Sequence, residues 1–383
     1  MRDPRVAKLA ELVIGYSLEL KPGNVIRLDG SEVAAPLVLE LYRAALAQGG
    51  LPYTNVALEG LAELVVEEGT EEQLIYISPI QRREVERIDA LVTLWSTANT
   101  RSFTRADADR HQRFLGARRE LVNRLWDRIA AGEVTWCGTL FPTNAHAQDA
   151  EMSLPEYEEF VYGACHVRES EDPVAHWRQI AADLRARASS MASVRGLRIV
   201  GPDTDLRIGV EGRKWLTAEG RHNLPDGEVF TSPVEEATEG EVRFTFPAIY
   251  GNREVEDVRL RFEGGRVVHA EAARGEEYLR SLLAMDDEAS VLGEFAFGLN
   301  YEIDRFTRNI LFDEKIGGTV HVALGAGFPE AGGKNRSGLH WDMICDLREE
   351  GEIYADGEVI WRAGAFIGEP AQAEVAAAPA AAS

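Results

Sequence analysis

The first 193 residues alternate between helical segments and short strand segments that are largely apolar. Segments with helical periodicity near residues 4–19 and 105–131 are separated from one another by strand segments such as VIRLD and the largely apolar DALVTLWS. A strand that is apolar on both faces has to be covered on both faces, and helices that connect successive parallel strands provide that cover. The pattern therefore predicts an α/β N-terminal domain over residues 1–193, with an open, mostly parallel sheet.

The pattern changes near residue 195. From there, short runs in which apolar and polar residues alternate are separated by turns, as in EVEDVRLRFEGGRVVHAEA. Alternation with a period of two is typical of strands in antiparallel sheets that have one buried face. We therefore expect a β-rich (α+β) C-terminal domain over residues 194–368. The last segment, 369–383, has no aromatic residues and is expected to be a disordered tail.

Charge and composition exclude several classes of partner. The formal net charge of −23 at pH 7 disfavours nucleic acids and anionic membranes. No apolar run approaches the length of about 18–20 residues that a membrane span needs, and we recognise no signal peptide. No GxGxxG follows the first strand, so nothing indicates a dinucleotide site. The three cysteines have no CxxC spacing and suit a reducing compartment, so we expect a cytoplasmic protein.

The stretch SGLHWDMICD places a histidine and an aspartate two positions apart, at His340 and Asp342. In a strand, residues i and i+2 face the same side, with Cα atoms roughly 6.5–7 Å apart, so both side chains can converge on one point. Imidazole and carboxylate are suitable ligands for Zn, Mn, Co or Fe(II). The pair therefore indicates either part of a metal site or a buried histidine that is hydrogen-bonded to the neighbouring aspartate.

Three further residues in the β-rich half could complete a metal site. His321 lies in the apolar run GTVHVALG, where it is either a ligand or a core imidazole bonded to a carbonyl group. Glu294 lies in VLGEFAFGLN, and a carboxylate with such apolar neighbours needs a cation or hydrogen-bond donors. Glu228 follows a turn in LPDGEVFTSP and is alternatively an exposed turn acid. Together with His340 and Asp342, these residues match the ligand set of a two-metal site.

Glu314, in NILFDEKIGG, is a candidate for a different role. A carboxylate beside such a site can act as a general base that takes a proton from the attacking water. Its neighbours Asp313 and Lys315 equally fit an ordinary solvated helix end. The sequence leaves both alternatives open.

Five motifs give the chain a resemblance to a known family. They are AHAQDAEMSLPEYEEFVYGA, GRHNLPDGEVFTSP, LGEFAFGLN, NILFDEKIGGTVHVALG and SGLHWDM. In this order and spacing they resemble the thermophilic metallo-aminopeptidase (aminopeptidase T) family, and the resemblance covers nearly everything before the tail. It implies an α/β N-terminal domain, a β-rich C-terminal domain that carries the site, and assembly as a homodimer.

The resemblance also implies roles for the candidate residues. Its catalytic glutamate is matched by Glu314. Its five metal-ligand positions are matched by Glu228, Glu294, His321, His340 and Asp342. The implied cofactors are two divalent metal ions (Zn, Co, Mn or Mg), and the implied substrates are peptides with a free N-terminus.

One position departs from the family pattern. Phe328, seven residues after His321, stands where closer members of the family have a catalytic tyrosine. Phenylalanine cannot donate a hydrogen bond to a developing oxyanion, so another donor has to substitute or the activity is altered. Candidate substitutes are Tyr301, Asn335 and Arg336.

Two alternative functions follow from the same residues. The fold also resembles that of a mononuclear iron dioxygenase acting on dihydroxypyridines, in which His321, His340 and Asp342 would form a facial triad. The two remaining carboxylates argue against this alternative, because a single iron has no use for them. The missing tyrosine alternatively indicates a paralogue that binds metal or peptides without turnover.

Overall fold

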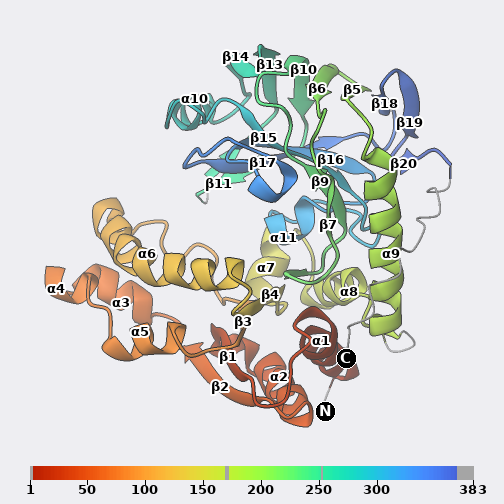
Figure 1. The fold of residues 1–383 in the computed structure, drawn as a ribbon. Coiled ribbons are helices and arrows are strands. Elements are labelled where there is room, and N and C mark those ends of the chain that lie inside the picture. The colour runs from red at the N-terminus through yellow and green to blue at the C-terminus, as the bar shows by residue number, and fades with distance from the viewer. Residues whose placement is uncertain (1–2, 169–171, 252, 369–383) are drawn as a thin grey trace. The chain divides into compact units, whose positions relative to one another are not determined.

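The computed structural model describes residues 3–168, 172–251 and 253–368, and the expected tail lies outside them (Figure 1). Among the described residues, no helix has the length and apolar character needed to cross a bilayer. The chain divides into two compact units. The N-terminal unit comprises Met1–Trp177 with Gly220–Pro225, and the C-terminal unit comprises Arg178–Glu219 with Asp226–Ser383. The domain boundary after residue 193 stays a prediction.

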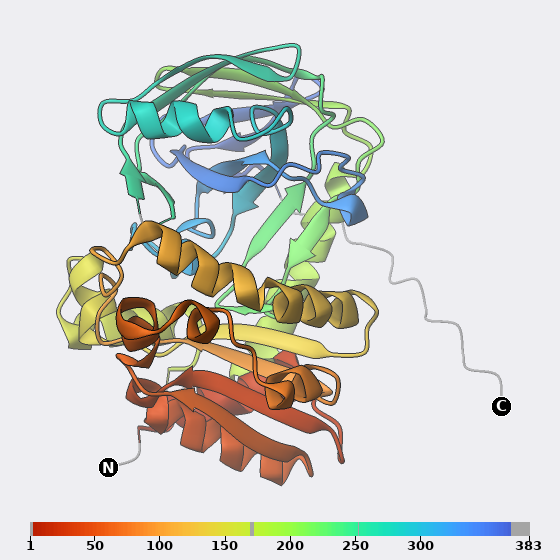
Figure 2. The same ribbon diagram turned by 90° about the vertical axis from the view of Figure 1, so that its left-hand side faces the viewer.

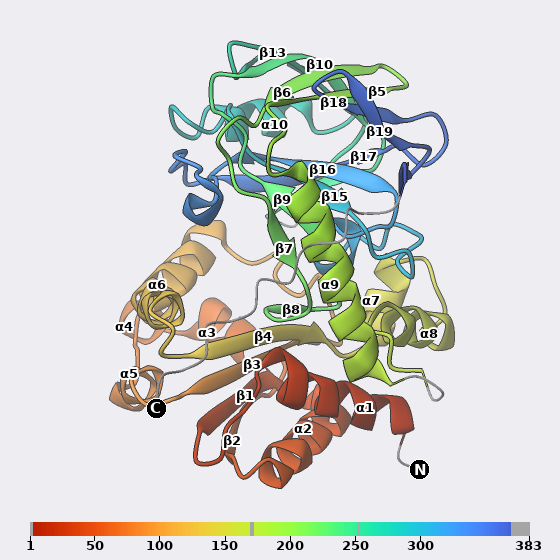
Figure 3. The ribbon, with the colours of Figure 1, turned by 45° about the vertical axis from the view of Figure 1, so that its right-hand side comes forward.

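The N-terminal unit is built on a five-stranded sheet in which paired strands run parallel (Figure 3). The strand order is β2-β1-β3-β4-β8, so a strand from the Gly220–Pro225 segment completes one edge. The strands are β1 (Val25–Ser31), β2 (Leu51–Ala57), β3 (Ala90–Trp95), β4 (Thr135–Leu140) and β8 (Asn223–Leu224). The inner strand β3 is largely buried, as its apolar run requires, and β1 is buried at Ile26, Arg27 and Leu28.

Helices alternate with these strands along the chain. They are α1 (Pro4–Leu12), a π-helix (Val13–Ser17), α2 (Ala35–Ala47), α3 (Leu61–Glu68), α4 (Glu71–Leu74), α5 (Pro79–Val85), α6 (Ala108–Ala130), α7 (Asn144–Asp149) and α8 (Leu154–Ala164). Helix α8 begins at a capping box, in which Ser153 and Glu156 each bind the backbone N–H of the other. Helix α9 (Pro173–Met191) then carries the chain into the C-terminal unit. The α/β prediction for the N-terminal region is confirmed.

Two antiparallel sheets form most of the C-terminal unit (Figure 2). The eight-stranded sheet contains, in spatial order, β14 (Arg266–Glu271), β13 (Val258–Glu263), β10 (Thr238–Phe244), β6 (Thr204–Gly209), β5 (Gly196–Gly201), β18 (Glu352–Ala355), β19 (Glu358–Arg362) and β20 (Ala365–Phe366). The five-stranded sheet contains β17 (His340–Asp346), β16 (Thr319–Gly325), β15 (Leu292–Gly298), β9 (Glu228–Thr231) and β7 (Leu216–Ala218). Smaller elements are the hairpin β11 (Ala248–Tyr250) and β12 (Arg253–Val255), helix α10 (Glu276–Leu283) and helix α11 (Ile310–Asp313). The β-rich prediction is also confirmed.

One hydrophobic core joins the two sheets of the C-terminal unit. The five-stranded sheet contributes every second residue of its strands, for example Val320 and Val322 from β16 and Trp341 and Met343 from β17. Because side chains alternate along a strand, the residues between these face the opposite side of the sheet. That opposite side carries the candidate site.

Candidate metal centre

The predicted ligands lie on four adjacent strands of the five-stranded sheet, on the face turned away from the core. Strand order brings together β17, β16, β15 and β9, although these strands are far apart in sequence. The register places Glu294 of β15 and Asp342 of β17 on either side of Ala323, whose small side chain leaves space above the sheet. A bulge at Gly293 sets the direction of Glu294, and only glycine fits there because a Cβ atom would lie 2.1 Å from the Ala326 carbonyl oxygen. The five residues are Glu228, Glu294, His321, His340 and Asp342.

Glu294 lies between the two histidines. Its Oε2 is 3.4 Å from Nε2 of His340, and its Oε1 is 3.8 Å from Nε2 of His321. Each histidine faces a second acid, since His340 Nε2 is 3.5 Å from Asp342 Oδ1 and His321 Nε2 is 3.7 Å from Glu228 Oε2. One ligand atom each from Glu294, His340 and Asp342 lie within 4.8 Å of one another, a spacing that can hold a metal ion.

Both imidazole rings are held by backbone carbonyl groups on the side away from the cluster. His321 Nδ1 lies 2.8 Å from the carbonyl oxygen of Glu314, and His340 Nδ1 lies 2.9 Å from that of Ala326. A carbonyl oxygen can only accept, so Nδ1 must carry the proton in both rings. Nε2 of each ring is thereby directed at the acids, in the orientation typical of histidines that bind metal ions.

Two carboxylate oxygens of the cluster have no hydrogen-bond partner. They are Glu228 Oε2 and Asp342 Oδ1, and both are buried. Glu228 retains 8% of its exposure and the side chain of Asp342 12%, so water does not replace the missing partners readily. Buried carboxylate oxygens of this kind need a cation or a donor. The donor set and these two oxygens therefore fit divalent metal ions.

Burial and mutual charge shift the pKa values in the cluster. Burial raises the pKa of Glu228 well above its ordinary value. Burial opposes ionisation of Glu294 as well, but the adjacent His321 and His340 outweigh it and lower the pKa of that acid. Burial lowers the pKa of each histidine, whereas the facing acids raise it more, to about 10 for His321 and about 12 for His340. With no cation bound, both rings are protonated at neutral pH and offset part of the acidic charge.

Glu314 borders the cluster from helix α11, where it is the C-cap residue. Its backbone carbonyl group anchors His321, and its side chain forms an ion pair with Lys315. Burial raises the pKa of Glu314, the ammonium group of Lys315 opposes that shift, and Asp342 adds to it. The interpretation of this segment as a solvated helix end is wrong, because the side chain of Lys315 is fully buried and Asp313 is 2% exposed.

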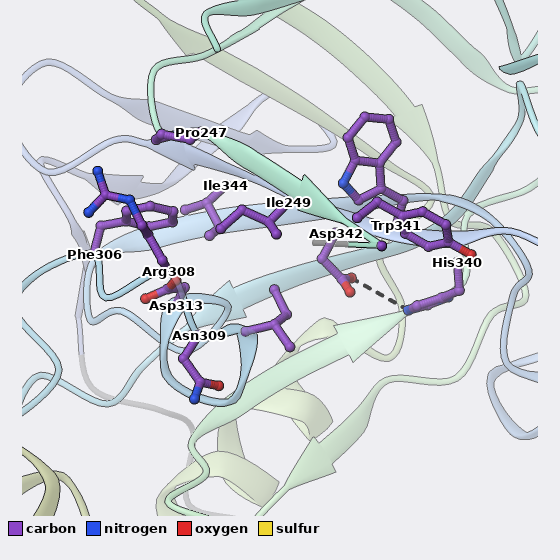
Figure 4. A pocket seen from close by; sticks show the side chains of 13 residues that line it. Pro247, Ile249, Phe306, Arg308, Asn309, Asp313, His340, Trp341, Asp342 and Ile344 are labelled. Atoms are coloured by element: carbon purple, nitrogen blue, oxygen red, sulfur yellow. Dashed lines mark ion pairs between the residues drawn. The ribbon is translucent and has the colours of Figure 1, made fainter. Parts of the chain in front are cut away.

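A cavity of about 360 Å³ adjoins the cluster within the C-terminal unit. His340 and Asp342 line one end of it, and Phe306, Arg308 and Asp313 line the other (Figure 4). Ile344 lies between these ends, because it follows Asp342 on the same face of β17. The volume of the cavity suits a small bound molecule that reaches the candidate metal-binding residues.

Phe328 lies at the edge of the cluster. Its ring centroid is 5.6 Å from that of His340, with the rings nearly perpendicular. Two of the expected substitutes for a tyrosine hydroxyl are engaged elsewhere, since Tyr301 donates to the Gly364 carbonyl oxygen and the Asn335 amide to that of Glu288. The third, Arg336, is exposed. The sequence did not indicate that Lys315 is buried beside Glu314, or that a cavity adjoins the cluster, because neither feature has a local signal.

Buried imidazole and carboxylate donors beside a cavity are the arrangement expected of a metal-dependent enzyme. The sequence model of the thermophilic metalloprotease (M29) family matches residues 2–366, and the chain belongs to that family. It is therefore a hydrolase of peptide bonds that depends on divalent metal, and the resemblance predicted from the motifs is confirmed.

Individual relatives agree with this assignment. Aminopeptidase T of Thermus thermophilus is 29% identical, over 91% of this chain and 95% of the relative. The solved structure of wild-type AmpT from Thermus thermophilus matches with a TM-score of 0.83 and 26% identity, covering 95% of this chain and 99% of that one. A 2,5-dihydroxypyridine dioxygenase from Pseudomonas putida KT2440 matches with a TM-score of 0.58 and 15% identity, over 94% of this chain and 96% of that one. The last likeness shows a shared fold alone.

Proposed function

We propose that this chain is an aminopeptidase that holds two divalent metal ions (Zn, Co, Mn or Mg). The observation that carries the proposal is the position of Glu294, whose two oxygens face the two histidines separately. A carboxylate in that position suits sharing between two ions. The names of the relatives support release of N-terminal residues as the activity. The proposed ligands are Glu228, Glu294, His321, His340 and Asp342.

The charges of the cluster also support a pair of ions. Five acids and the ammonium group of Lys315 leave a net charge of about −4 when the acids are ionised and both histidines are neutral, and two divalent cations carry about +4. A single divalent cation would leave about two uncompensated charges in a low-dielectric interior. The five acids are Asp226, Glu228, Glu294, Glu314 and Asp342. Asp313 stands outside this count, because the backbone N–H and the hydroxyl group of Thr307 already donate hydrogen bonds to its Oδ1.

The proposed mechanism divides the work between the ions and Glu314. When bound, the ions supply Lewis acidity, which polarises the carbonyl group of the first peptide bond and favours ionisation of the attacking water. Glu314 accepts a proton from that water as the water oxygen bonds to the carbonyl carbon. The same carboxyl group then gives the proton to the leaving amine as the C–N bond breaks. One water is consumed for each N-terminal residue released.

The cavity beside the cluster supplies the binding site for a substrate side chain. Its walls include Ile249, Phe306 and Ile344, which are apolar, and it reaches His340 and Asp342 (Figure 4). A peptide whose first carbonyl group lies at the cluster can extend one adjacent side chain over Ile344. An individual acidic side chain beside the cluster can hold the cationic α-amine of the same peptide.

The test is a combined measurement of metal content and peptide release. Purified protein loaded with Zn, Co, Mn or Mg should contain about two ions per chain and release N-terminal residues from short peptides. Peptides with an acetylated N-terminus should not be cleaved. Failure of all four ions to support release from any free peptide would refute the proposal.

The dioxygenase alternative predicts a different result in the same experiment. It requires one iron per chain and uptake of dioxygen with a dihydroxypyridine substrate. Glu228 and Glu294 count against it, because an iron held by the two histidines and Asp342 leaves both buried acids uncompensated.

We further propose a cytoplasmic location and a homodimer. The thiols of Cys137, Cys165 and Cys345 are buried, which agrees with a reducing compartment. The dimer rests on the family resemblance. Light scattering on the purified protein tests it directly.

A further inference from the structure

Lys315 is a completely buried cation at the border of the metal cluster. Its side chain has 0% exposure, and its Nζ forms an ion pair with Glu314 and lies 3.9 Å from Oδ1 of Asp226. Lysine is almost never fully buried unless it is paired with an acid. The proposed mechanism gives this residue no role beyond its charge, although it touches the proposed base.

The backbone around Lys315 is fixed on both sides. Its N–H donates to the Phe312 carbonyl oxygen, and its own carbonyl oxygen accepts from the N–H of Asn300 at 3.2 Å. The side-chain amide of Asn300 donates to the carbonyl oxygen of Asp226 at 2.9 Å. Asp226 precedes the ligand Glu228 by two residues, with Gly227 between them. Lys315 therefore lies between the proposed base and the start of strand β9, in a position that the main chain determines.

We propose that Lys315 is a positioning residue that holds the carboxylate of Glu314 at the cluster and acts on the reaction through that carboxylate. The inference rests on the proposed function, in which Glu314 transfers the proton. Glutamate has three rotatable side-chain bonds, and a base that leaves its place by about 1 Å can lose about a hundredfold in rate. The ion pair with a lysine whose side chain is fully buried supplies the missing constraint.

The electrostatic surroundings explain why a cation is needed there. Glu314 shares the site with several other acids, which repel its carboxylate, and Asp342 is one that acts on it directly. Without a nearby cation, the carboxylate of Glu314 would favour a rotamer that points away from these acids. The ammonium group of Lys315, placed between Glu314 and Asp226, makes the position near the cluster the favourable one.

A double-mutant cycle tests the proposal. The variants are Lys315→Met, Glu314→Gln and the two combined, assayed as the metal-loaded full chain with a short peptide. We expect Lys315→Met to lower kcat by about a hundredfold, with KM within about threefold and the metal content unchanged. The double variant should be no more than about threefold slower than Glu314→Gln alone, because Lys315 has nothing left to position.

Two outcomes would overturn the proposal. One is a kcat for Lys315→Met within about twofold of the unmodified protein. The other is a double variant about a hundredfold slower than Glu314→Gln, because independent losses multiply. Lys214→Met is the matched control, since Lys214 is exposed in the same unit, and it should leave kcat unchanged.

Thermal melting keeps the proposal testable if Lys315→Met folds poorly. Glu314→Gln removes the acid that Lys315 contacts, so this single variant should melt below the unmodified protein, and the double variant should recover part of the loss. Additive shifts in Tm would contradict the ion pair. This measurement needs no turnover, so it also separates failure of this inference from failure of the proposed aminopeptidase activity.

Discussion

Binding of metal to this protein should release at least two protons per chain at neutral pH. Nδ1 of His321 and His340 is committed to carbonyl oxygens, and Nε2 of each ring faces acids at 3.4–3.8 Å. These acids raise the pKa of the rings to about 10 and about 12, so Nε2 carries a proton when no metal is bound. A metal ion binds Nε2 only after that proton leaves. Glu228, whose pKa burial also raises, can only add to the number.

The size of the effect follows from this count. Two displaced protons make the overall constant for binding both ions fall by about a hundredfold, or about 2.7 kcal/mol, for each unit by which the pH drops, which is about tenfold for each ion. The sign follows from the raised pKa values, because lower pH favours the protonated rings that exclude the metal. The dependence should weaken near pH 10, where half of His321 has lost its proton in the metal-free protein.

Calorimetric titration with Mn²⁺ provides the measurement. Titrations at pH 7 in three buffers of different ionisation enthalpy give the number of protons released, and a series from pH 6.5 to 8 gives the slope. The His321→Gln variant should release about one proton fewer per chain, because one of the two imidazole rings is missing. A release of fewer than about one proton per chain, or an affinity that does not change with pH, would refute the orientation of the two rings.

Three further substitutions test separate parts of the site. Glu294→Gln should reduce the metal content below about one ion per chain and lower kcat by more than about a hundredfold, because this carboxylate faces both histidines. Metal analysis and a peptide-release assay measure the two effects, and retention of two ions would contradict the shared position. Phe328→Tyr adds a phenol group beside His340 and should raise kcat about tenfold, whereas an unchanged kcat would mean that another group already binds the oxyanion. Ile344→Trp fills the cavity and should raise KM at least about tenfold for peptides with bulky side chains, with an unchanged metal content; equal KM values would place the substrate elsewhere.

Strand periodicity made the faces of the site predictable. In β16, Val320 and Val322 enter the core, and His321 between them must face the other way. The same alternation puts His340 and Asp342 on one side of β17. The sequence alone therefore predicts which side chains share a face of their own strand.

The neighbours of each strand were not predictable from periodicity. Glu294 meets both histidines because β15 pairs with β16, and β16 with β17, in registers that no local pattern contains. The bulge at Gly293 shifts the register by one position, which periodicity also cannot show. The burial of Lys315 depends in the same way on Asp226, which is distant in sequence. The pairing of segments that are distant in sequence therefore determined the contacts that local composition could not predict.

Residue 314 serves the site through two chemically independent groups. The carbonyl group that steadies His321 belongs to the main chain and survives every side-chain replacement, whereas the acid belongs to the glutamate alone. With Glu314 as the proposed base, a single codon change could therefore abolish turnover and leave the backbone contact to His321 in place. On the proposed function, one substitution would separate an enzyme of this kind from a protein that binds metal ions without turnover, with the sheet unchanged.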